Sequence, residues 1–286
     1  MEANHTSATP GIDLLQLYGR DERVGRIVQW LSSGQARKIA LRNLIGSAKS
    51  VIAAATASQL KETQLFILSD REQAAYFCND LEKLTGQSGL EQAQKRILYF
   101  PASYKKPYES DEVDNANVLS RTEVLNRLGQ PYDQTGAPLW IVTYPEALAE
   151  KVITTRCLAA HTVQLHKGEA VSQDFLIDFL EENRFEWVDF VAQPGQYALR
   201  GGIIDVFSFA NDTPYRIEFD GDKVDSIRSF EVGTQLSIAR HDVISLLPDL
   251  QDKVEQKERI SFLTYFSEKS VLCQYRPDEP VHPVPF

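Results

Sequence analysis

One stretch decides the fold of the second half of this chain: QYALRGGIIDVFSFANDTPYRIEFDGDKVDSIRSFEV, residues 196–232. It contains strand-like runs in close succession, with no helical pattern between them. Asp220-Gly221-Asp222 is a strong turn signal, because glycine tolerates the positive φ that hairpin turns need. Strands joined by short turns form an antiparallel sheet, so this region predicts a small α+β domain. The predicted strands span 196–209, 214–219 and 223–232.

The second of these runs alternates apolar and charged residues. A period of two sends successive side chains to opposite faces of a sheet, so one set faces the core and the other faces outward. An outward row beside Arg200 can make charge-assisted, bidentate contacts with a partner. The alternative is a solvated sheet face with weak cross-strand ion pairs. The inward set is Tyr215, Ile217 and Phe219, and the outward set is Arg216, Glu218 and Asp220.

Two adjacent glycines, Gly201 and Gly202, interrupt the first predicted strand. Glycine inside a strand weakens it and often marks a bulge or a close approach of another backbone. We therefore expect one of these features at this point. The alternative is a simple bend in a long strand.

Upstream, apolar strand-like segments and amphipathic helix-like segments alternate. The strands are apolar on both faces, which is typical of parallel strands covered by helices. The alternation predicts an α/β lobe with a RecA-like parallel sheet, followed by the α+β domain. In this lobe the predicted strands span 37–46, 64–70, 96–101 and 139–144, and the predicted helices span 12–32, 47–61, 71–85 and 117–128. The pattern changes after about residue 153, so the predicted strands at 161–168 and 186–193 and the predicted helix at 172–184 belong to the α+β domain.

A nucleotide-binding loop would lie between the first predicted strand and its helix. The pattern G-x-x-x-x-G-K-[ST] needs glycine at both ends of the loop, then lysine and a hydroxyl. Lys49 and Ser50 are present, but the glycine positions hold Asn43 and Ala48, whose Cβ atoms oppose a phosphate-wrapping loop. We expect a degenerate loop that binds no nucleotide; the alternative is that ATP binds here. No motif predicts a catalytic residue, a metal site or a resident cofactor.

Composition and charge exclude several classes of protein. With 286 residues, 43% of them hydrophobic and 24% charged, the chain is long enough for roughly two folded domains. A formal net charge of −10 argues against a surface that binds nucleic acid as a whole. No apolar run approaches the ~20 residues of a membrane span, and the N-terminus lacks a signal pattern. Three scattered cysteines predict free thiols in a reducing, cytoplasmic compartment.

Three strings are highly specific in combination: RGGIID at 200–205, PYRIEF at 214–219 and DSIR at 225–228. On these strings, residues 15–245 resemble the N-terminal module of the bacterial transcription-repair coupling factors, the Mfd family, and more distantly the excision-repair protein UvrB. UvrB has an intact phosphate loop and an aromatic-rich hairpin, and their absence here favours the coupling factors. Flanking segments agree: GSAK at 46–49 resembles the family's degenerate loop, and YFP at 99–101, PYE at 107–109 and SR at 120–121 resemble its next block.

The resemblance implies roles for particular residues. In the family, the contact with UvrA centres on two arginines and a nearby aromatic residue. By motif, the arginines correspond to Arg200 and Arg216. The aromatic position holds Asp220, so this chain departs from the family at the apolar part of the contact. The implied UvrA-binding surface consists of Arg200, Arg216, Glu218 and Asp220.

The resemblance also implies a division of labour. The chain is expected to be a non-catalytic module that recruits UvrA to sites of stalled RNA polymerase. The full-length protein is expected to be a translocase on double-stranded DNA that uses ATP and magnesium. The implied domains are a RecA-like lobe at 1–153, a UvrA-binding domain at 154–238, and a return segment toward the first lobe with a linker at 239–286.

Charge favours a protein partner for the second domain. Residues 154–238 hold seven Lys and Arg against fourteen Asp and Glu, so this domain would repel a phosphate backbone. Two alternative functions remain open. One is a nucleotide-dependent, DNA-remodelling enzyme of the UvrB type. The other is a structural module that masks its own UvrA site through intramolecular contact with C-terminal parts of the longer protein.

Overall fold

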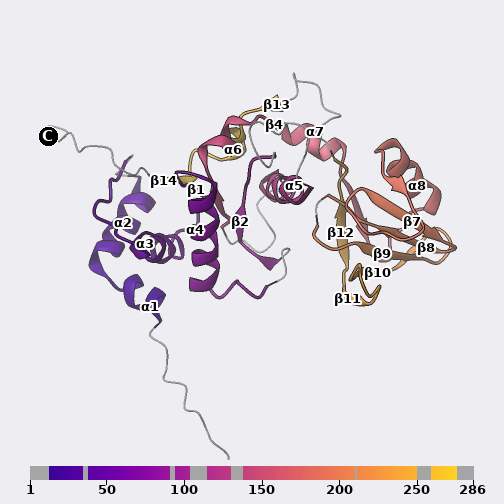
Figure 1. Cartoon of the computed structure of the whole chain (residues 1–286), viewed down its shortest axis with the longest axis horizontal. Coiled ribbons are helices and arrows are strands. Elements are labelled where there is room, and N and C mark those ends of the chain that lie inside the picture. Colours follow the sequence, from indigo (N-terminus) through magenta and orange to yellow (C-terminus); the bar gives the residue numbers. More distant parts are fainter. Residues whose placement is uncertain are drawn as a thin grey trace, which may run out of the picture.

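The computed structural model describes residues 13–34, 38–90, 94–103, 115–129, 138–209, 211–249 and 259–275. Within these ranges the elements gather in two lobes that lie side by side along the long axis (Figure 1). The first lobe has a four-stranded parallel sheet between helices, and the second lobe has a six-stranded, mainly antiparallel sheet. The predicted combination of an α/β lobe and an antiparallel domain is confirmed.

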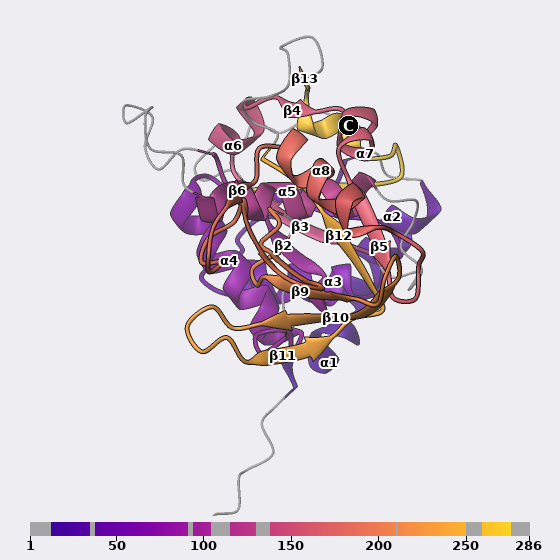
Figure 2. The same ribbon diagram turned by 90° about the vertical axis from the view of Figure 1, so that its right-hand side faces the viewer.

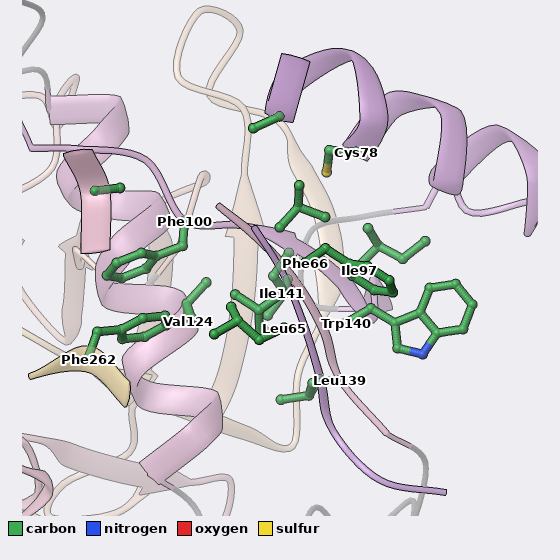
Figure 3. Close-up of a cluster of buried hydrophobic side chains, with 14 of the residues drawn as sticks. Leu65, Phe66, Cys78, Ile97, Phe100, Val124, Leu139, Trp140, Ile141 and Phe262 are labelled. Atoms are coloured by element: carbon green, nitrogen blue, oxygen red, sulfur yellow. The ribbon is translucent and has the colours of Figure 1, made fainter. Parts of the chain in front are cut away.

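The first lobe is built around a sheet with the strand order β14-β1-β3-β2, all neighbours parallel. Its central strands β1 and β3 are buried on both faces because helices cover both sides. Figure 3 shows this core, in which Phe100 stacks on Phe262 with ring centroids 3.8 Å apart. The strands are β1 (Gln64–Ile67), β2 (Ile97–Tyr99), β3 (Trp140–Thr143) and β14 (Val271–Gln274), and the helices are α1 (Leu14–Gly19), α2 (Glu22–Ser33), α3 (Ala48–Ala57), α4 (Arg71–Leu84), α5 (Asn115–Gly129), α6 (Pro145–Ala149) and α7 (Thr155–Ala160).

The predicted strand at 37–46 is wrong: its described part, 38–46, forms no strand, and Leu41 and Ile45 are exposed. The position beside β1 is taken by β14, whose Val271 N–H donates to the Thr63 carbonyl oxygen. A local apolar pattern cannot decide between two candidate edge strands, because pairing depends on the whole sheet. The end of the described chain therefore completes the first sheet.

The second lobe is built on a sheet with the order β11-β10-β9-β8-β7-β6, in which only the β6–β7 pair is parallel. Helix α8 and the β5–β12 pair cover one face, where Leu176 and Leu180 pack against Ile204 and Ile217. Figure 2 shows this sheet in front of the first lobe, with β11 at one of its edges. The elements are β5 (Val163–His166), α8 (Gln173–Glu182), β6 (Glu186–Trp187), β7 (Gln196–Arg200), β8 (Ile203–Val206), β9 (Tyr215–Phe219), β10 (Val224–Phe230), β11 (Ser237–Arg240) and β12 (Val243–Leu246).

The predicted long strand at 196–209 is wrong: it is a hairpin of β7 and β8 that turns at Gly201 and Gly202. Gly201 has a φ of +60°, the left-handed region that favours glycine. A Cβ on Gly202 would lie 3.1 Å from the Phe219 carbonyl oxygen, so the predicted close backbone approach is confirmed. The turn predicted at Asp220-Gly221-Asp222 joins β9 and β10, and the Asp220 N–H donates to the Lys223 carbonyl oxygen over 2.9 Å.

The two lobes meet where the chain crosses from β12 back to the first lobe. Leu246 is buried in the core of the second lobe, and the next residue, Leu247, is buried in the core of the first. The Ser208 hydroxyl donates to the Leu247 carbonyl oxygen and accepts from its N–H, at 3.3 and 2.8 Å. The return path continues through β13 (Arg259–Ile260), which pairs with β4 (Val152–Ile153). The division at 1–153, 154–238 and 239–286 stays a prediction.

Candidate functional site

Three of the predicted site residues, Arg200, Arg216 and Glu218, lie on the sheet face opposite α8, which we call the outer face, and Asp220 lies in the β9–β10 turn. Ala198, Asp205, Arg216 and Arg228 stand in register on four neighbouring strands of this face. Their neighbours along the strands point toward α8 because side chains alternate between faces. The prediction that the charged residues of β9 lie opposite the buried ones is confirmed for Tyr215, Ile217, Arg216 and Glu218.

Asp205 and Arg216 form a bidentate ion pair at the centre of the outer face. Arg216 Nε donates to Asp205 Oδ1 over 2.7 Å, and Nη2 donates to Oδ2 over 2.8 Å. The Asp205 side chain is 1% exposed and that of Arg216 is 16% exposed. The hydrogen bonds from Arg216 to this carboxylate raise the pKa of Arg216. Its guanidinium also lies 4.6 Å from the ring centre of the buried Phe230, so Arg216 is held from several sides.

Arg200, at the end of β7, is the more accessible of the two predicted arginines. Its side chain is 39% exposed, and its Nη1 lies 3.7 Å from Asp205 Oδ2. Nη2 donates to the Asp189 carbonyl oxygen over 3.0 Å. The guanidinium lies 4.7 Å from the ring centre of Phe190. One buried carboxylate therefore brings Arg200 and Arg216 together, while the side chain of Arg200 stays partly exposed.

The two predicted acidic residues of the surface differ in their contacts. Glu218 forms an ion pair with Arg228 and accepts a hydrogen bond of 2.5 Å from the Ser226 hydroxyl. Asp220 is exposed in the β9–β10 turn, where its backbone N–H donates to the Lys223 carbonyl oxygen. Asp220 is thus the accessible carboxylate of the predicted set, whereas Glu218 is already paired within the sheet.

The role of Asp205 was not predicted from the sequence, although Asp205 belongs to the RGGIID string at 200–205. An acidic residue inside the apolar run IIDVF was the signal available. Its pairing with Arg216 depends on the β8–β9 register, which places the two residues opposite each other. Phe190 was also missed, because its contact with Arg200 spans a loop and a sheet edge that no local pattern predicts.

The predicted degenerate loop precedes α3 in the first lobe. Asn43 has a φ of +59°, a conformation that asparagine tolerates better than most residues. Lys49 Nζ donates to Gln73 Oε1 over 2.8 Å and lies 4.6 Å from the ring centre of Tyr275. The buried Ser50 hydroxyl donates to Asp80 Oδ2 over 2.8 Å. Both side chains that would contact a nucleotide in an intact loop are bonded to other parts of the lobe.

The described ranges contain no candidate metal site and no candidate membrane span. There, no group of three or more His, Cys, Asp or Glu side chains is arranged to hold a metal ion. None of the described helices has the length and apolar character needed to cross a bilayer. The three cysteines are free thiols, and burial raises the pKa of Cys78 to about 12 and that of Cys273 to about 11.

Comparison with known proteins points to one family. Residues 163–251, which include the whole outer face, match the UvrB interaction domain family. The chain is 28% identical over 208 residues, 73% of its length, to a transcription-repair-coupling factor of Escherichia coli. It is 29% identical to those of Myxococcus xanthus and Bacillus subtilis, over 78% and 82% of its length.

The chain spans 17% to 19% of the length of these three relatives. In each of these relatives, the matched region is therefore a small part of a much longer protein. The resemblance predicted from the sequence is confirmed: residues 163–251 match the UvrB interaction domain, and most of the chain is similar to transcription-repair-coupling factors.

Proposed function

We propose that the outer face of the second lobe is a docking surface for UvrA, and that the chain is a non-catalytic module that recruits UvrA within a transcription-repair coupling factor. The observation that carries this proposal is the placement of Arg200. Its guanidinium is fixed by Asp205 and the Asp189 carbonyl, yet more than a third of the side chain is exposed. It lies inside the segment that matches the UvrB interaction domain.

A fixed, exposed guanidinium suits recognition of an acidic partner surface. Arginine presents several donors in a planar fork, so it pairs with carboxylates in a defined geometry. Holding the side chain before binding lowers the conformational entropy lost on association. Asp205, itself paired with Arg216, holds the guanidinium of Arg200. Asp220 lies at the exposed turn of the same sheet. We propose that Arg200 makes the central contact and that Glu218 and Asp220 belong to the rim.

The direct test is a titration of UvrA with the wild-type chain and Arg200→Ala. Loss of a central arginine contact typically costs ~2 kcal/mol or more, so we expect affinity to fall by about thirtyfold or more. Arg184→Ala is the matched control, because Arg184 is exposed just beyond α8, on the other side of the sheet. Unchanged affinity of Arg200→Ala would contradict the proposal.

Arg216 is a less informative position for this test, although it belongs to the predicted surface. Arg216→Glu would place a second carboxylate against the buried Asp205. Two like charges in a buried site destabilise the fold. A loss of binding in this variant would therefore mix loss of the contact with loss of structure, whereas Arg200→Ala leaves the buried pair intact.

We propose that the first lobe binds no nucleotide and that ATP, magnesium, RNA polymerase and double-stranded DNA engage other parts of the longer protein. Support comes from Lys49 and Ser50, whose polar atoms are bonded to Gln73 and Asp80. Titration with ATP and magnesium tests this directly. Micromolar binding that Lys49→Ala abolishes would instead support a UvrB-type enzyme. Masking of the surface by the rest of the protein stays a prediction, tested by comparing UvrA affinity of this chain and the intact protein.

A further inference from the structure

Phe190 is a large apolar side chain left in solvent at the edge of the outer face. It follows β6 in the loop that leads to β7, and it is 65% exposed. Its neighbour Val191 is 1% exposed and packs in a small cluster with Ala198, Phe207 and Phe230 on the outer face. The loop therefore buries one of two adjacent apolar side chains and presents the other.

The backbone around Phe190 is held in place. The Val188 N–H donates to the Tyr197 carbonyl oxygen over 2.9 Å, and Gln196 Oε1 accepts from the N–H groups of Ala192 and Gln193 over 3.0 Å each. On the other side, Arg200 donates to the Asp189 carbonyl oxygen. A ring on a fixed loop loses little conformational entropy when a partner covers it.

Phe190 and Arg200 form one composite feature. The guanidinium lies 4.7 Å from the ring centre, within the range of a cation–π contact. The ring supports one side of the guanidinium while both groups remain accessible. Aromatic and arginine side chains that meet at the centre of an interface are the residue types that contribute most to binding.

The place of Phe190 and Arg200 on the sheet bears on the loss of the family's aromatic residue, whose position holds Asp220 in this chain. Asp220 cannot supply an apolar anchor, because it is an exposed carboxylate in the β9–β10 turn. Along the sheet, β7 with Arg200 lies between β6 and β8, so the Phe190 loop adjoins Arg200 from the β6 side. The β9–β10 turn lies on the opposite side of β7.

We infer that Phe190 is the aromatic anchor of the UvrA-docking surface in this chain, and that it binds together with Arg200 to a partner surface presenting a carboxylate beside an apolar side chain. This inference rests on the proposed function. It moves the apolar contact from the β9–β10 turn to the β6 edge of the sheet. The docking surface then extends from Asp220 across Arg200 to Phe190.

The test is a titration of UvrA with Phe190→Ala, Phe190→Tyr and Trp187→Ala. Trp187 is the matched control: it is 61% exposed and lies in register with Tyr197, whose ring belongs to the core on the α8 side. We expect Phe190→Ala to weaken binding at least about tenfold, because it removes the aromatic anchor that pairs with Arg200. Phe190→Tyr keeps the ring, and we expect it and Trp187→Ala to stay within about threefold of wild type.

Two further outcomes separate the inference from the proposed function. If Arg200→Ala loses affinity but Phe190→Ala does not, the docking surface stands and the role of Phe190 is overturned. If neither variant loses affinity, both are overturned. In a double-mutant cycle, the effect of Phe190→Ala should be smaller in the Arg200→Ala background, because the pair acts as a unit. Independent effects would overturn the composite anchor, and thermal melts of each variant verify folding.

Discussion

The start of α3 in the first lobe and the outer face of the second lobe both place basic side chains where a binding motif predicts them, yet their surroundings differ. Lys49 is bonded to Gln73 and lies against Tyr275, a residue that follows β14. Arg200 is oriented by Asp205 and Asp189 but remains 39% exposed. A binding motif is available to a partner only where neighbouring side chains orient the charge and leave it accessible.

Two buried carboxylates, Asp205 in the second lobe and Glu123 in the first, differ in how closely a basic side chain pairs with them. Asp205 receives two hydrogen bonds from Arg216 at 2.7 and 2.8 Å. Glu123, on α5 of the first lobe, lies 3.6 Å from Arg127. Burial raises the pKa of Glu123 to about 7, an effect that Arg127 opposes and the nearby Asp212 increases. Asp205 thus differs from Glu123 in having a close, bidentate arginine partner.

The largest expected effect is the loss of stability in Asp205→Asn. This variant removes the charge that holds Arg216 and Arg200, while the guanidinium of Arg216 stays largely buried. Breaking a buried ion pair from one side costs about 3 kcal/mol or more, so the free energy of unfolding in urea should fall by about that amount. Asp222→Asn, in the exposed β9–β10 turn, is the control. Equal stability of the two variants would show that Asp205 does not organise the outer face.

The pH dependence of Glu123→Gln sharpens the contrast between the carboxylates. The folded-state pKa of Glu123, about 7, lies above the ordinary glutamate value of 4.5, so the unfolded chain ionises first as pH rises. The wild type therefore loses stability between these two values, and the loss is complete above pH 7. We expect Glu123→Gln to be more stable than wild type by up to about 3 kcal/mol at pH 8, with a much smaller difference at pH 5.

Urea unfolding at the two pH values measures this difference, with the exposed Glu268→Gln as the control. A difference between wild type and Glu123→Gln that does not change with pH would contradict the raised pKa. The charge of Asp212, in the β8–β9 connection, contributes to the raised pKa of Glu123. Asp212→Asn should therefore produce part of the same pH-dependent gain in stability.

Gly202→Ala tests the close backbone approach at the β7–β8 turn, directly after Arg200. The added Cβ would lie 3.1 Å from the Phe219 carbonyl oxygen, a backbone atom that cannot move without disturbing β9. We expect a loss of about 1–2 kcal/mol in unfolding free energy, within the usual range for crowding substitutions. Gly233→Ala is the matched control, since a Cβ there meets no atom within 4 Å. Similar stability of the two variants would contradict the close approach.

The smallest expected effect is that of Lys49→Met, which tests whether Lys49 serves only contacts within the first lobe. The variant keeps the length of the side chain but loses the hydrogen bond to Gln73 and the contact with Tyr275. We expect a loss of about 1 kcal/mol or less in thermal or urea unfolding, with no change in UvrA affinity. A loss of UvrA affinity without unfolding would show that the first lobe takes part in docking.

Much of the second lobe follows from local sequence. The alternation in β9 places Arg216 and Glu218 opposite Tyr215 and Ile217 because the side-chain period of a strand is two. The Asp220-Gly221-Asp222 turn follows from the φ that Gly221 adopts. The long strand expected at 196–209 was wrong because two glycines form a tight turn there. The alternation pattern alone cannot distinguish a long strand from two strands joined in this way.

Local patterns of the chain determined where most strands and helices form, which side chains of β9 face outward, and which phosphate-loop glycines are missing. The tertiary structure alone decided that β14 pairs with β1, that Asp205 lies opposite Arg216, and that Phe190 meets Arg200. The physical reason is one of range. Side-chain periodicity and turn geometry depend on neighbouring residues, whereas strand register and contacts between distant segments depend on how the whole core packs.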